Sequence, residues 1–356
     1  MNEAKAIRFS EILGQDRAKA IVQCAISKGR IPHAYLFTGI AGVGKTSLGR
    51  AIAAYLNCKT AVDSEPCGEC GSCKQIRSSG HPNLIVVRPD GESIKIEQIR
   101  DIQESMRFSP LSGKYRVVIM DQADTMTEEA ANAFLKTLEE PPQGNLLILN
   151  AIEPDNLLPT IVSRCQRVSF VPLGVGVIAD YLTTEMGVER DRAVVLARLA
   201  EGSLGRAVAM VEADFLERRD QWLKCAMEIP GLKPEELLDL ALELSNEKAP
   251  TQGRVAKYQI GGLLDLLGVL AMWYRDLLVM KQKGAEGLIL NVDFLDQLKN
   301  FSKKFKVLQL YESLLILDQA QTDIRMRRNK ALVLERTMLR LRDLAGVHNQ
   351  LTPKVG

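Results

Sequence analysis

The chain has 356 residues, of which 46% are hydrophobic and 25% are charged. This composition is typical of a folded protein with two or three domains, and it excludes disorder for most of the chain. The formal net charge is only +2, because 46 Lys and Arg face 44 Asp and Glu. The molecule is therefore not a polycation that coats nucleic acid, and any such contact must be local.

Neither export nor membrane insertion is expected. The first residues, MNEAKAIRFSEILG, contain no apolar region and no small-residue cleavage site of a signal peptide. The longest apolar stretch, residues 260–280, is interrupted by Asp265, Arg275 and Asp276, and charges there would be costly in lipid. This stretch is therefore predicted to be a buried helix, and we expect a cytoplasmic protein with no membrane partner.

Short apolar runs alternate with helical patterns in the first half of the chain, which predicts βαβ units with a parallel sheet. The strand-sized runs are Ala34–Thr38, Leu84–Val87, Val117–Met120, Leu146–Asn150 and Val168–Phe170. Ligands of such sheets bind at the carboxyl ends of the strands. The residues that follow these runs are therefore candidates for a functional site.

After about residue 173 the strand-like runs stop, and helical periodicity continues nearly to the end of the chain. We therefore predict three domains. An α/β domain covers residues 1–172, a small helical lid covers residues 173–213, and an all-helical domain covers residues 214–356.

A phosphate-binding loop follows the first strand-sized run. Residues 39–46 read GIAGVGKT, which fits the pattern G-x4-G-K-[ST] between a strand and a helix. In such loops the glycines let backbone N–H groups face the phosphates, the lysine reaches the terminal phosphates, and the last residue holds magnesium. ATP and Mg²⁺ are the expected ligands. The predicted binding residues are Gly39, Gly42, Gly44, Lys45 and Thr46.

Hydrolysis of a bound nucleotide needs a carboxylate for the magnesium shell and a second group that orients the attacking water. Asp121, directly after the third strand-sized run, is the candidate carboxylate. The next residue is Gln122, an amide that cannot take a proton from water, and Asp124 on the following turn is a poor substitute. We therefore expect weak or absent ATP hydrolysis by this chain.

Four of the seven cysteines form a cluster with the spacing C-x8-C-x2-C-x2-C. The members are Cys58, Cys67, Cys70 and Cys73. In a large cytosolic chain this pattern indicates a metal rather than disulfides. Four sulfurs leave no open position for a substrate, so a structural role is predicted, with Zn²⁺ as the expected ion and an iron–sulfur cluster as the alternative. Cys24 and Cys225 are expected to be buried hydrophobic residues.

Six segments of the chain form a specific combination. They are ILGQ at 12–15, HAYLF at 33–37, the cysteine insert at 58–73, GHPNL at 80–84, NAFLKTLEEPP at 132–142 and LPTIVSRC at 158–165. Together they resemble the clamp-loader subunits of the bacterial replicative DNA polymerase, within the AAA+ ATPases. The resemblance covers nearly the whole chain. It implies a AAA+ P-loop domain with a zinc-binding insert, a helical lid, and an all-helical collar that joins the subunits.

The resemblance also implies a role for one arginine. In these pentameric loaders ATP lies at the interfaces, and the Ser-Arg-Cys segment of one subunit presents its arginine to the nucleotide of the next. Arg164 is that residue here. A guanidinium near the γ-phosphate offsets the charge that develops in phosphoryl transfer. We therefore expect Arg164 to be an arginine finger in trans, and an ion pair within its own domain is the alternative.

Within this family the chain is most similar to the delta-prime subunits. Gln122, the His81-Pro82 segment and Arg328-Asn329-Lys330 favour this interpretation. The expected function is that of a non-motor subunit of the DNA polymerase III holoenzyme, which helps load the sliding clamp onto primed DNA. The expected partners are loader subunits of gamma or tau and delta type, the clamp, and primed DNA through the complex. The alternative is an ATP-hydrolysing motor subunit of gamma or tau type.

Two departures from the motor subunits affect the expected coupling between nucleotide and lid. Where motor subunits place a threonine that senses the γ-phosphate, this chain has Asn150 or Ala151, and its lid arginine is displaced by one residue to Arg206. We therefore expect the nucleotide to act as a structural ligand on which stability depends.

The end of the chain is basic, with eleven Lys or Arg against five Asp or Glu in residues 301–356. No aromatic residue follows Tyr311 to stack on bases. We therefore expect these cations to be solvated or packed within the collar.

Overall fold

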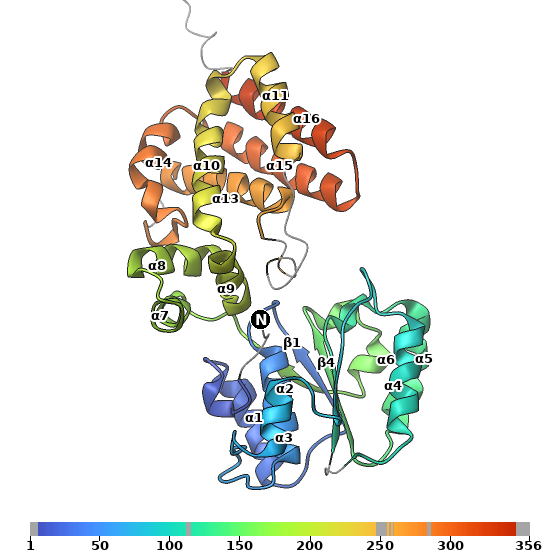
Figure 1. The fold of residues 1–356 in the computed structure, drawn as a ribbon. Coiled ribbons are helices and arrows are strands. Elements are labelled where there is room, and N and C mark those ends of the chain that lie inside the picture. The colour runs from blue at the N-terminus through green and yellow to red at the C-terminus, as the bar shows by residue number, and fades with distance from the viewer. Residues whose placement is uncertain are drawn as a thin grey trace, which may run out of the picture. The chain divides into compact units, whose positions relative to one another are not determined.

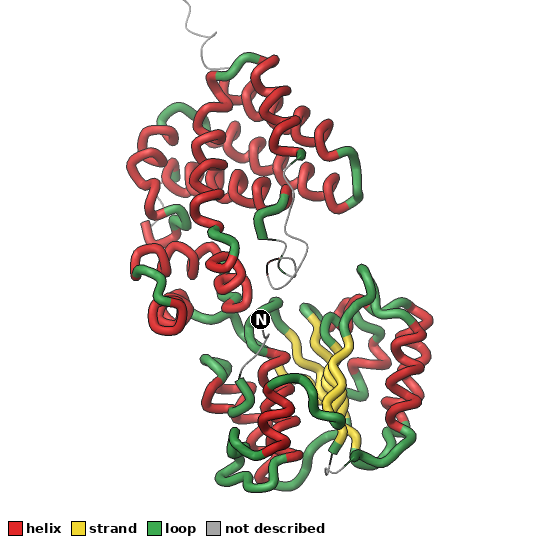
Figure 2. Tube along the Cα trace, viewed as in Figure 1, coloured by secondary structure: helices red, strands yellow, loops and turns green. Residues whose placement is uncertain are grey.

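The computed structural model describes residues 6–111, 115–246, 255, 258, 260–282 and 286–346. The chain divides into two compact units, one formed by Met1–Ile178 with Glu201–Gly205 and the other by Ala179–Ala200 with Arg206–Gly356. Figure 1 follows the ribbon in chain order, and Figure 2 shows that the described strands all belong to the first unit. The lid predicted for residues 173–213 contributes to both units, and the three domain boundaries stay a prediction.

The first unit contains a five-stranded parallel sheet with the order β2-β3-β4-β1-β5. Its strands are β1 (Ala34–Thr38), β2 (Leu84–Val87), β3 (Arg116–Met120), β4 (Asn145–Ala151) and β5 (Gln166–Ser169). The first four lie where apolar runs predicted them, because strands buried on both faces consist of near-continuous apolar residues. β5 begins two residues before the run predicted at 168–170, and of its residues only Val168 is buried. The three central strands, β1, β3 and β4, are buried along their whole length.

Helices cover both faces of this sheet (Figure 1). They are α1 (Asp16–Ser27), α2 (Lys45–Asn57), α3 (Gly71–Arg77), α4 (Ile96–Met106), α5 (Glu128–Glu139) and α6 (Pro159–Val162), with short 3-10 turns at Phe9–Glu11, Ala123–Thr125 and Pro154–Asn156. Alternation along β3 divides the core, since Ile119 packs on the side of α1–α3 and Val118 packs on the side of α4–α6. The nucleotide loop and the helices are thereby fixed to one rigid sheet.

The remaining described elements are helical. They are α7 (Val175–Met186), α8 (Arg190–Leu199), α9 (Leu204–Glu212), α10 (Phe215–Glu228), α11 (Pro234–Ser245), α13 (Leu263–Lys281), α14 (Leu295–Ser302), α15 (Val307–Arg325) and α16 (Lys330–Gly346), with 3-10 turns at Ile229–Gly231, Glu286–Leu288 and Val292–Phe294. The predicted buried helix is α13, and Trp273 and Leu277 are among its buried residues. Within the described residues, no helix has the length and apolar character needed to cross a membrane.

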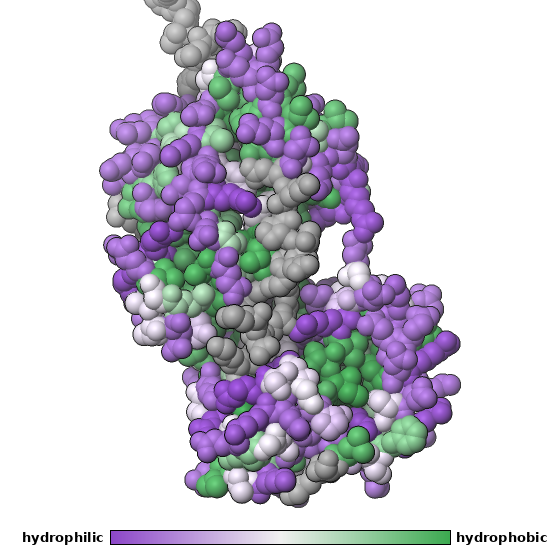
Figure 3. All heavy atoms as spheres, viewed as in Figure 1, coloured by the Kyte–Doolittle hydropathy of each residue, from purple (hydrophilic) through white to green (hydrophobic). Residues whose placement is uncertain are grey.

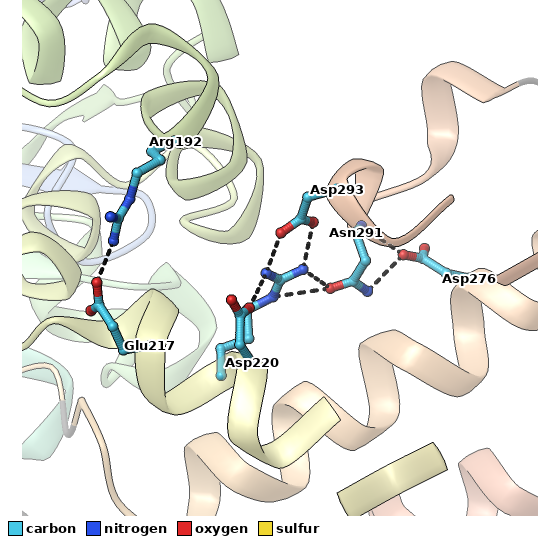
Figure 4. A network of polar contacts seen from close by, with 7 residues as sticks. Arg192, Glu217, Asp220, Asp276, Asn291 and Asp293 are labelled. Carbon is cyan, nitrogen blue, oxygen red and sulfur yellow. Dashed lines mark hydrogen bonds and ion pairs between the residues drawn. The ribbon is translucent and has the colours of Figure 1, made fainter. Parts of the chain in front are cut away.

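A buried polar network holds the segment after α13 in place (Figure 4). Arg219 of α10 is fully buried and donates to both carboxylate oxygens of Asp293, at 2.7 and 2.8 Å, and to Oδ1 of Asn291 at 2.6 Å. Asn291 donates in turn from its backbone N and from Nδ2 to Asp276 Oδ2, each at 2.8 Å. Buried charges are tolerated when they are paired and hydrogen-bonded in this way.

Replacing Arg219 with Met should destabilise the helical unit by about 3–5 kcal/mol, because it leaves buried acceptors without a partner. Arg190→Met is a matched control in the same unit, since Arg190 makes an exposed pair with Asp180 and exposed pairs contribute about 0–1 kcal/mol. Urea unfolding followed by tryptophan fluorescence measures both variants. Equal, small losses for the two would contradict the structural role assigned to Arg219.

Two arginines near the basic end of the chain pair with one buried acid. Asp323 of α15 is fully buried, accepts from Arg328 at 2.8 Å, and also pairs with Arg336 of α16. These two arginines are paired within the unit but remain 56% and 47% exposed, in agreement with the prediction of solvated or collar-packed cations. Residues 347–356 lie outside the described part of the chain. Figure 3 shows that polar side chains cover most of the visible face of this unit.

Candidate nucleotide site and metal centre

The phosphate-binding loop connects β1 to α2. Gly39, Gly42 and Gly44 have φ values of +138°, +80° and +108°, which favour glycine because side chains with a Cβ rarely adopt them. A Cβ at Gly39 would lie 2.7 Å from the carbonyl oxygen of Phe170. The glycines that the motif predicted are therefore required by the backbone, and they lead into the N-terminus of α2, whose first N–H groups are available to an anion.

Lys45, the first residue of α2, folds back over the loop. Its Nζ donates to the carbonyl oxygens of Gly39 and of Ile40, the latter at 2.9 Å, and the residue is largely buried. These contacts hold the ammonium group beside the loop, where a terminal phosphate is expected.

Thr46, Asp121 and Asn150 form a connected triad at the carboxyl ends of β3 and β4. Asp121 Oδ1 accepts from Thr46 Oγ1 and from Asn150 Nδ2, both at 2.7 Å, and Asn150 Nδ2 also lies 3.2 Å from Thr46 Oγ1. Asn150 Oδ1 is buried and has no hydrogen-bond partner among the described residues. The structure thus brings the predicted carboxylate to the predicted magnesium-binding hydroxyl, and of the two sensor candidates it is Asn150 that joins them.

The residues after Asp121 offer no general base at this point. Gln122 is exposed and has φ +55°. Asp124 Oδ2 accepts from the backbone N–H of Ile152, at 3.4 Å, and is therefore directed toward the end of β4. A side chain that takes a proton from water must lie within hydrogen-bond reach of it beside the phosphate, and no contact of these two residues places them there.

Two side chains that are distant in sequence donate hydrogen bonds to backbone carbonyl oxygens of the loop. Gln15 Nε2 donates to the carbonyl oxygens of Val43, at 3.3 Å, and Val171, at 2.7 Å. Ser203 Oγ donates to the carbonyl oxygen of Ala41 at 2.7 Å. Sequence reasoning did not assign these roles, because they depend on pairs separated by 28 to 162 residues.

The displaced lid arginine, Arg206, has a partner in the helical unit. Its Nη2 lies 3.1 Å from Asp265 Oδ1, and Asp265 Oδ2 accepts from the backbone N–H of Gly261 at 2.8 Å. Burial raises the pKa of Asp265, and the Arg206 guanidinium opposes that rise. Arg206 is therefore engaged in an ion pair of its own unit.

Arg164 lies between α6 and β5 and has partners within its own unit. Its Nη2 is 2.6 Å from Glu139 Oε1, at the end of α5, and its Nη1 donates to the carbonyl oxygen of Thr160 at 2.9 Å. The arginine side chain is 35% exposed and the glutamate 50% exposed. Glu139 was not predicted as a functional residue, although it lies in the NAFLKTLEEPP segment that carries the family resemblance.

The four cysteines of the cluster converge as their spacing predicted. All four Sγ atoms lie within 4.8 Å of one another, with Cys58 and Cys70 4.0 Å apart and Cys67 and Cys73 3.9 Å apart. A tetrahedron with zinc–sulfur bonds of about 2.3 Å has sulfur–sulfur edges of about 3.8 Å. The donor set and its dimensions therefore fit one closed, four-coordinate metal site.

The surroundings of the cluster favour the thiolate of Cys67, whereas burial raises the pKa of Cys73. Cys67 Sγ accepts from the backbone N–H of Cys70 at 3.3 Å, and Cys58 Sγ accepts from that of Cys67 at 3.4 Å. Hydrogen bonds, first of all from the Thr60 side chain, lower the pKa of Cys67 to about 5. Cys73 lies in the first turn of α3 and is fully buried in the core. This attaches the metal centre to the main body of the unit.

The prediction for the other two cysteines was wrong in part. Cys24 is exposed and Cys225 is half-buried. The helical period explains the exposure of Cys24. The buried face of α1 is formed by Ala18, Val22 and Ile26, and position 24 lies on the other side.

The GHPNL segment is structural. His81 is buried, which lowers its pKa, and its Nδ1 accepts from the backbone N–H of Asn83 at 3.1 Å. The Asn83 amide pairs with the backbone of Leu111, accepting at 2.8 Å and donating at 2.6 Å. These contacts attach the segment to Leu111, and His81 is not among the described residues that form the cysteine cluster.

Comparisons with known proteins agree with the motifs. A family model described as "DNA polymerase III, delta subunit" matches residues 14–174. DNA polymerase III subunit gamma of Buchnera aphidicola is 32% identical over 67% of this chain and 69% of that protein. Subunit delta' of Bacillus subtilis is 38% identical over 58% of this chain and 60% of its own length, and subunit tau of the same organism is 29% identical over 89% of this chain.

The chain spans 58% of the length of the Bacillus subtilis tau subunit and 32% of that of Escherichia coli. Its parallel-sheet α/β fold with a C-terminal helical region agrees with the fold class that the sequence predicted. By its similarity to the gamma, tau and delta' proteins and by the fold, the chain belongs to the family of DNA polymerase III clamp-loader subunits.

Proposed function

We propose that the chain is a non-motor subunit of the DNA polymerase III clamp loader, of the delta-prime type, in the cytoplasm. It helps to load the sliding clamp onto primed DNA together with subunits of gamma or tau and delta type. It holds a nucleotide in its own P-loop without turning it over, and it offers Arg164 to ATP in a neighbouring motor subunit. The observation that carries this proposal is an intact phosphate loop next to an exposed amide, Gln122, in the place of an acid.

The loop supports nucleotide binding in cis. Its three glycines have the required φ values, Lys45 lies over the loop, and Thr46 contacts Asp121 at 2.7 Å. When Mg²⁺ is bound at such a site it neutralises charge between the phosphates. Thr46 would hold the ion and Asp121 would orient its shell, whereas Gln122 cannot accept a proton from the attacking water.

The position of Arg164 supports a role in trans. Its pair with Glu139 is half-exposed, and exposed pairs contribute only about 0–1 kcal/mol. A triphosphate carries several negative charges, and arginine binds phosphate oxygens with two parallel hydrogen bonds. A neighbouring nucleotide would therefore displace Glu139 at little cost.

The helical unit supports the collar role. Residues 214–356 would join the subunits of the ring, and residues 173–213 would form the lid. On α15, Leu308, Tyr311 and Leu315 are 65%, 54% and 52% exposed, and their spacing puts them on one face of the helix. An exposed apolar stripe of this kind is typical of a surface that packs against another chain.

The ATP turnover of the purified chain tests the proposal. We expect no hydrolysis above background, and no change on Lys45→Ala, because Gln122 cannot act as a base. Turnover that Lys45→Ala abolishes would instead support the alternative, a motor subunit of gamma or tau type that uses Asp121 with Gln122 or Asp124. Colorimetric release of phosphate, with a tau-type subunit as the positive control, measures this directly.

A further inference from the structure

An arginine lies beside the carboxylate of the candidate nucleotide site. Arg88 directly follows β2, and its Nε is 3.7 Å from Asp121 Oδ2. The Asp121 side chain is 10% exposed and that of Arg88 is 50% exposed. The charged head of Arg88 therefore sits at the rim of the site, next to a nearly buried acid.

The sheet itself brings the two residues together. β2 and β3 are parallel neighbours with Val87 paired to Met120, and the backbone N–H of Asp121 donates to the carbonyl oxygen of Val87 at 2.9 Å. Arg88 and Asp121 thus leave adjacent strands at the same edge. Gln98 of α4 donates to the carbonyl oxygen of Arg88 at 2.7 Å, which fixes the backbone from the other side.

The two oxygens of Asp121 have different surroundings. Oδ1 accepts from Thr46 and from Asn150, both at 2.7 Å. Oδ2 is buried, has no hydrogen-bond partner in the described part of the chain, and has the guanidinium of Arg88 nearby. Arg88 is permanently charged, so its field acts on Asp121 whether or not a metal is present.

At a motor site Mg²⁺ supplies the positive charge between the carboxylate and the phosphates. A fixed cation beside Asp121 offsets part of the negative charge that attracts Mg²⁺, because opposite charges a few ångström apart interact strongly at a partly buried site. The same cation attracts the phosphates.

We propose that Arg88 makes nucleotide binding by this chain largely independent of a divalent cation. The ligand is a nucleoside diphosphate or triphosphate, and Arg88 with Lys45 supplies the charge that Mg²⁺ supplies elsewhere. This inference rests on the proposed nucleotide binding in cis. It also gives a second physical reason, besides Gln122, for a site that holds nucleotide without hydrolysing it.

The test is the affinity of the full-length chain for ADP, measured by isothermal titration calorimetry with excess Mg²⁺ and again with EDTA. The wild-type Kd should change by less than about threefold, whereas the Kd of Arg88→Gln should rise by about tenfold or more when EDTA replaces Mg²⁺. Arg88→Lys keeps the charge and should behave like the wild type. Arg100→Gln removes an exposed arginine of α4 and controls for the loss of one positive charge.

A tenfold loss of ADP affinity by the wild-type chain in EDTA would overturn the inference, even if Arg88→Gln did not fold. Equal metal dependence of wild type and Arg88→Gln would do the same. An absence of ADP binding under both conditions would overturn nucleotide binding in cis as well, and is thus distinguishable from failure of the Arg88 inference alone. None of these results bears on Arg164, whose role depends on the neighbouring site.

Discussion

Arg164→Ala should abolish rapid ATP hydrolysis at the one interface that this subunit serves in an assembled clamp loader. Arginine fingers contribute about 10³ to 10⁵ in rate to phosphoryl transfer. The other sites, which receive arginine fingers from other subunits, should continue to hydrolyse ATP. The steady-state rate of the whole complex therefore understates the loss at the one affected site. The variant should be measured in a single-turnover experiment with DNA and clamp, in which every site holds ATP. The amplitude of the fast phase should fall by the fraction of the bound ATP that occupies one site.

Two variants separate the role in trans from a structural role. Glu139→Gln breaks the ion pair of 2.6 Å but keeps the arginine, so it should retain the fast phase. Arg167→Ala removes an exposed arginine of β5 and should also retain it. If Glu139→Gln lost as much as Arg164→Ala while the fold stayed intact, Arg164 would act only through its pair within the chain.

The metal centre gives the second large effect. We expect one tightly bound zinc per chain, and Cys73→Ala should lose it, because the variant leaves three sulfurs for a four-coordinate ion. Thiolates this close repel one another until a cation neutralises them, so metal binding and local folding are coupled. Hydrogen exchange should therefore accelerate in residues 58–77 and remain slow in the strands of the sheet.

Elemental analysis and native thiol titration measure this prediction. Cys24→Ala is the matched control, since Cys24 is an exposed cysteine outside the cluster, and it should keep the full zinc content. Four freely titratable thiols in a chain that contains no metal would contradict the zinc site. Iron with sulfide and visible absorption would instead support the iron–sulfur alternative.

The sequence predicted those parts of the structure that depend on residues close together in the chain. The glycine loop needs residues only a few positions apart, and the strands are short apolar runs bounded by turns. The cysteine cluster was predicted because three of its members lie within seven residues. The fourth, Cys58, directly follows α2, the helix that starts at the end of the phosphate-binding loop. In each case the residues that form the feature lie within one short segment of the sequence.

The residues that were missed act across long sequence separations. Ser203 reaches Ala41 from 162 residues away, and Arg219 meets Asp293 from 74 residues away. Arg88 had a detectable signal, because it directly follows a predicted strand of a parallel sheet, where ligands bind. Its contact with Asp121 depends on β2 and β3 being neighbours in the sheet. The apolar runs predict the strands but not their order.

We propose that this subunit gives its arginine to a reaction that it does not itself perform. The most direct measurement compares Lys45→Ala and Arg164→Ala of this chain side by side in a reconstituted loader, by single-turnover ATP hydrolysis. We expect Arg164→Ala to remove the fast phase of one site, and Lys45→Ala to leave fast hydrolysis within about twofold of the wild type, since the ATP concerned is bound by the neighbour. Loss of the fast phase with Lys45→Ala and its retention with Arg164→Ala would contradict it.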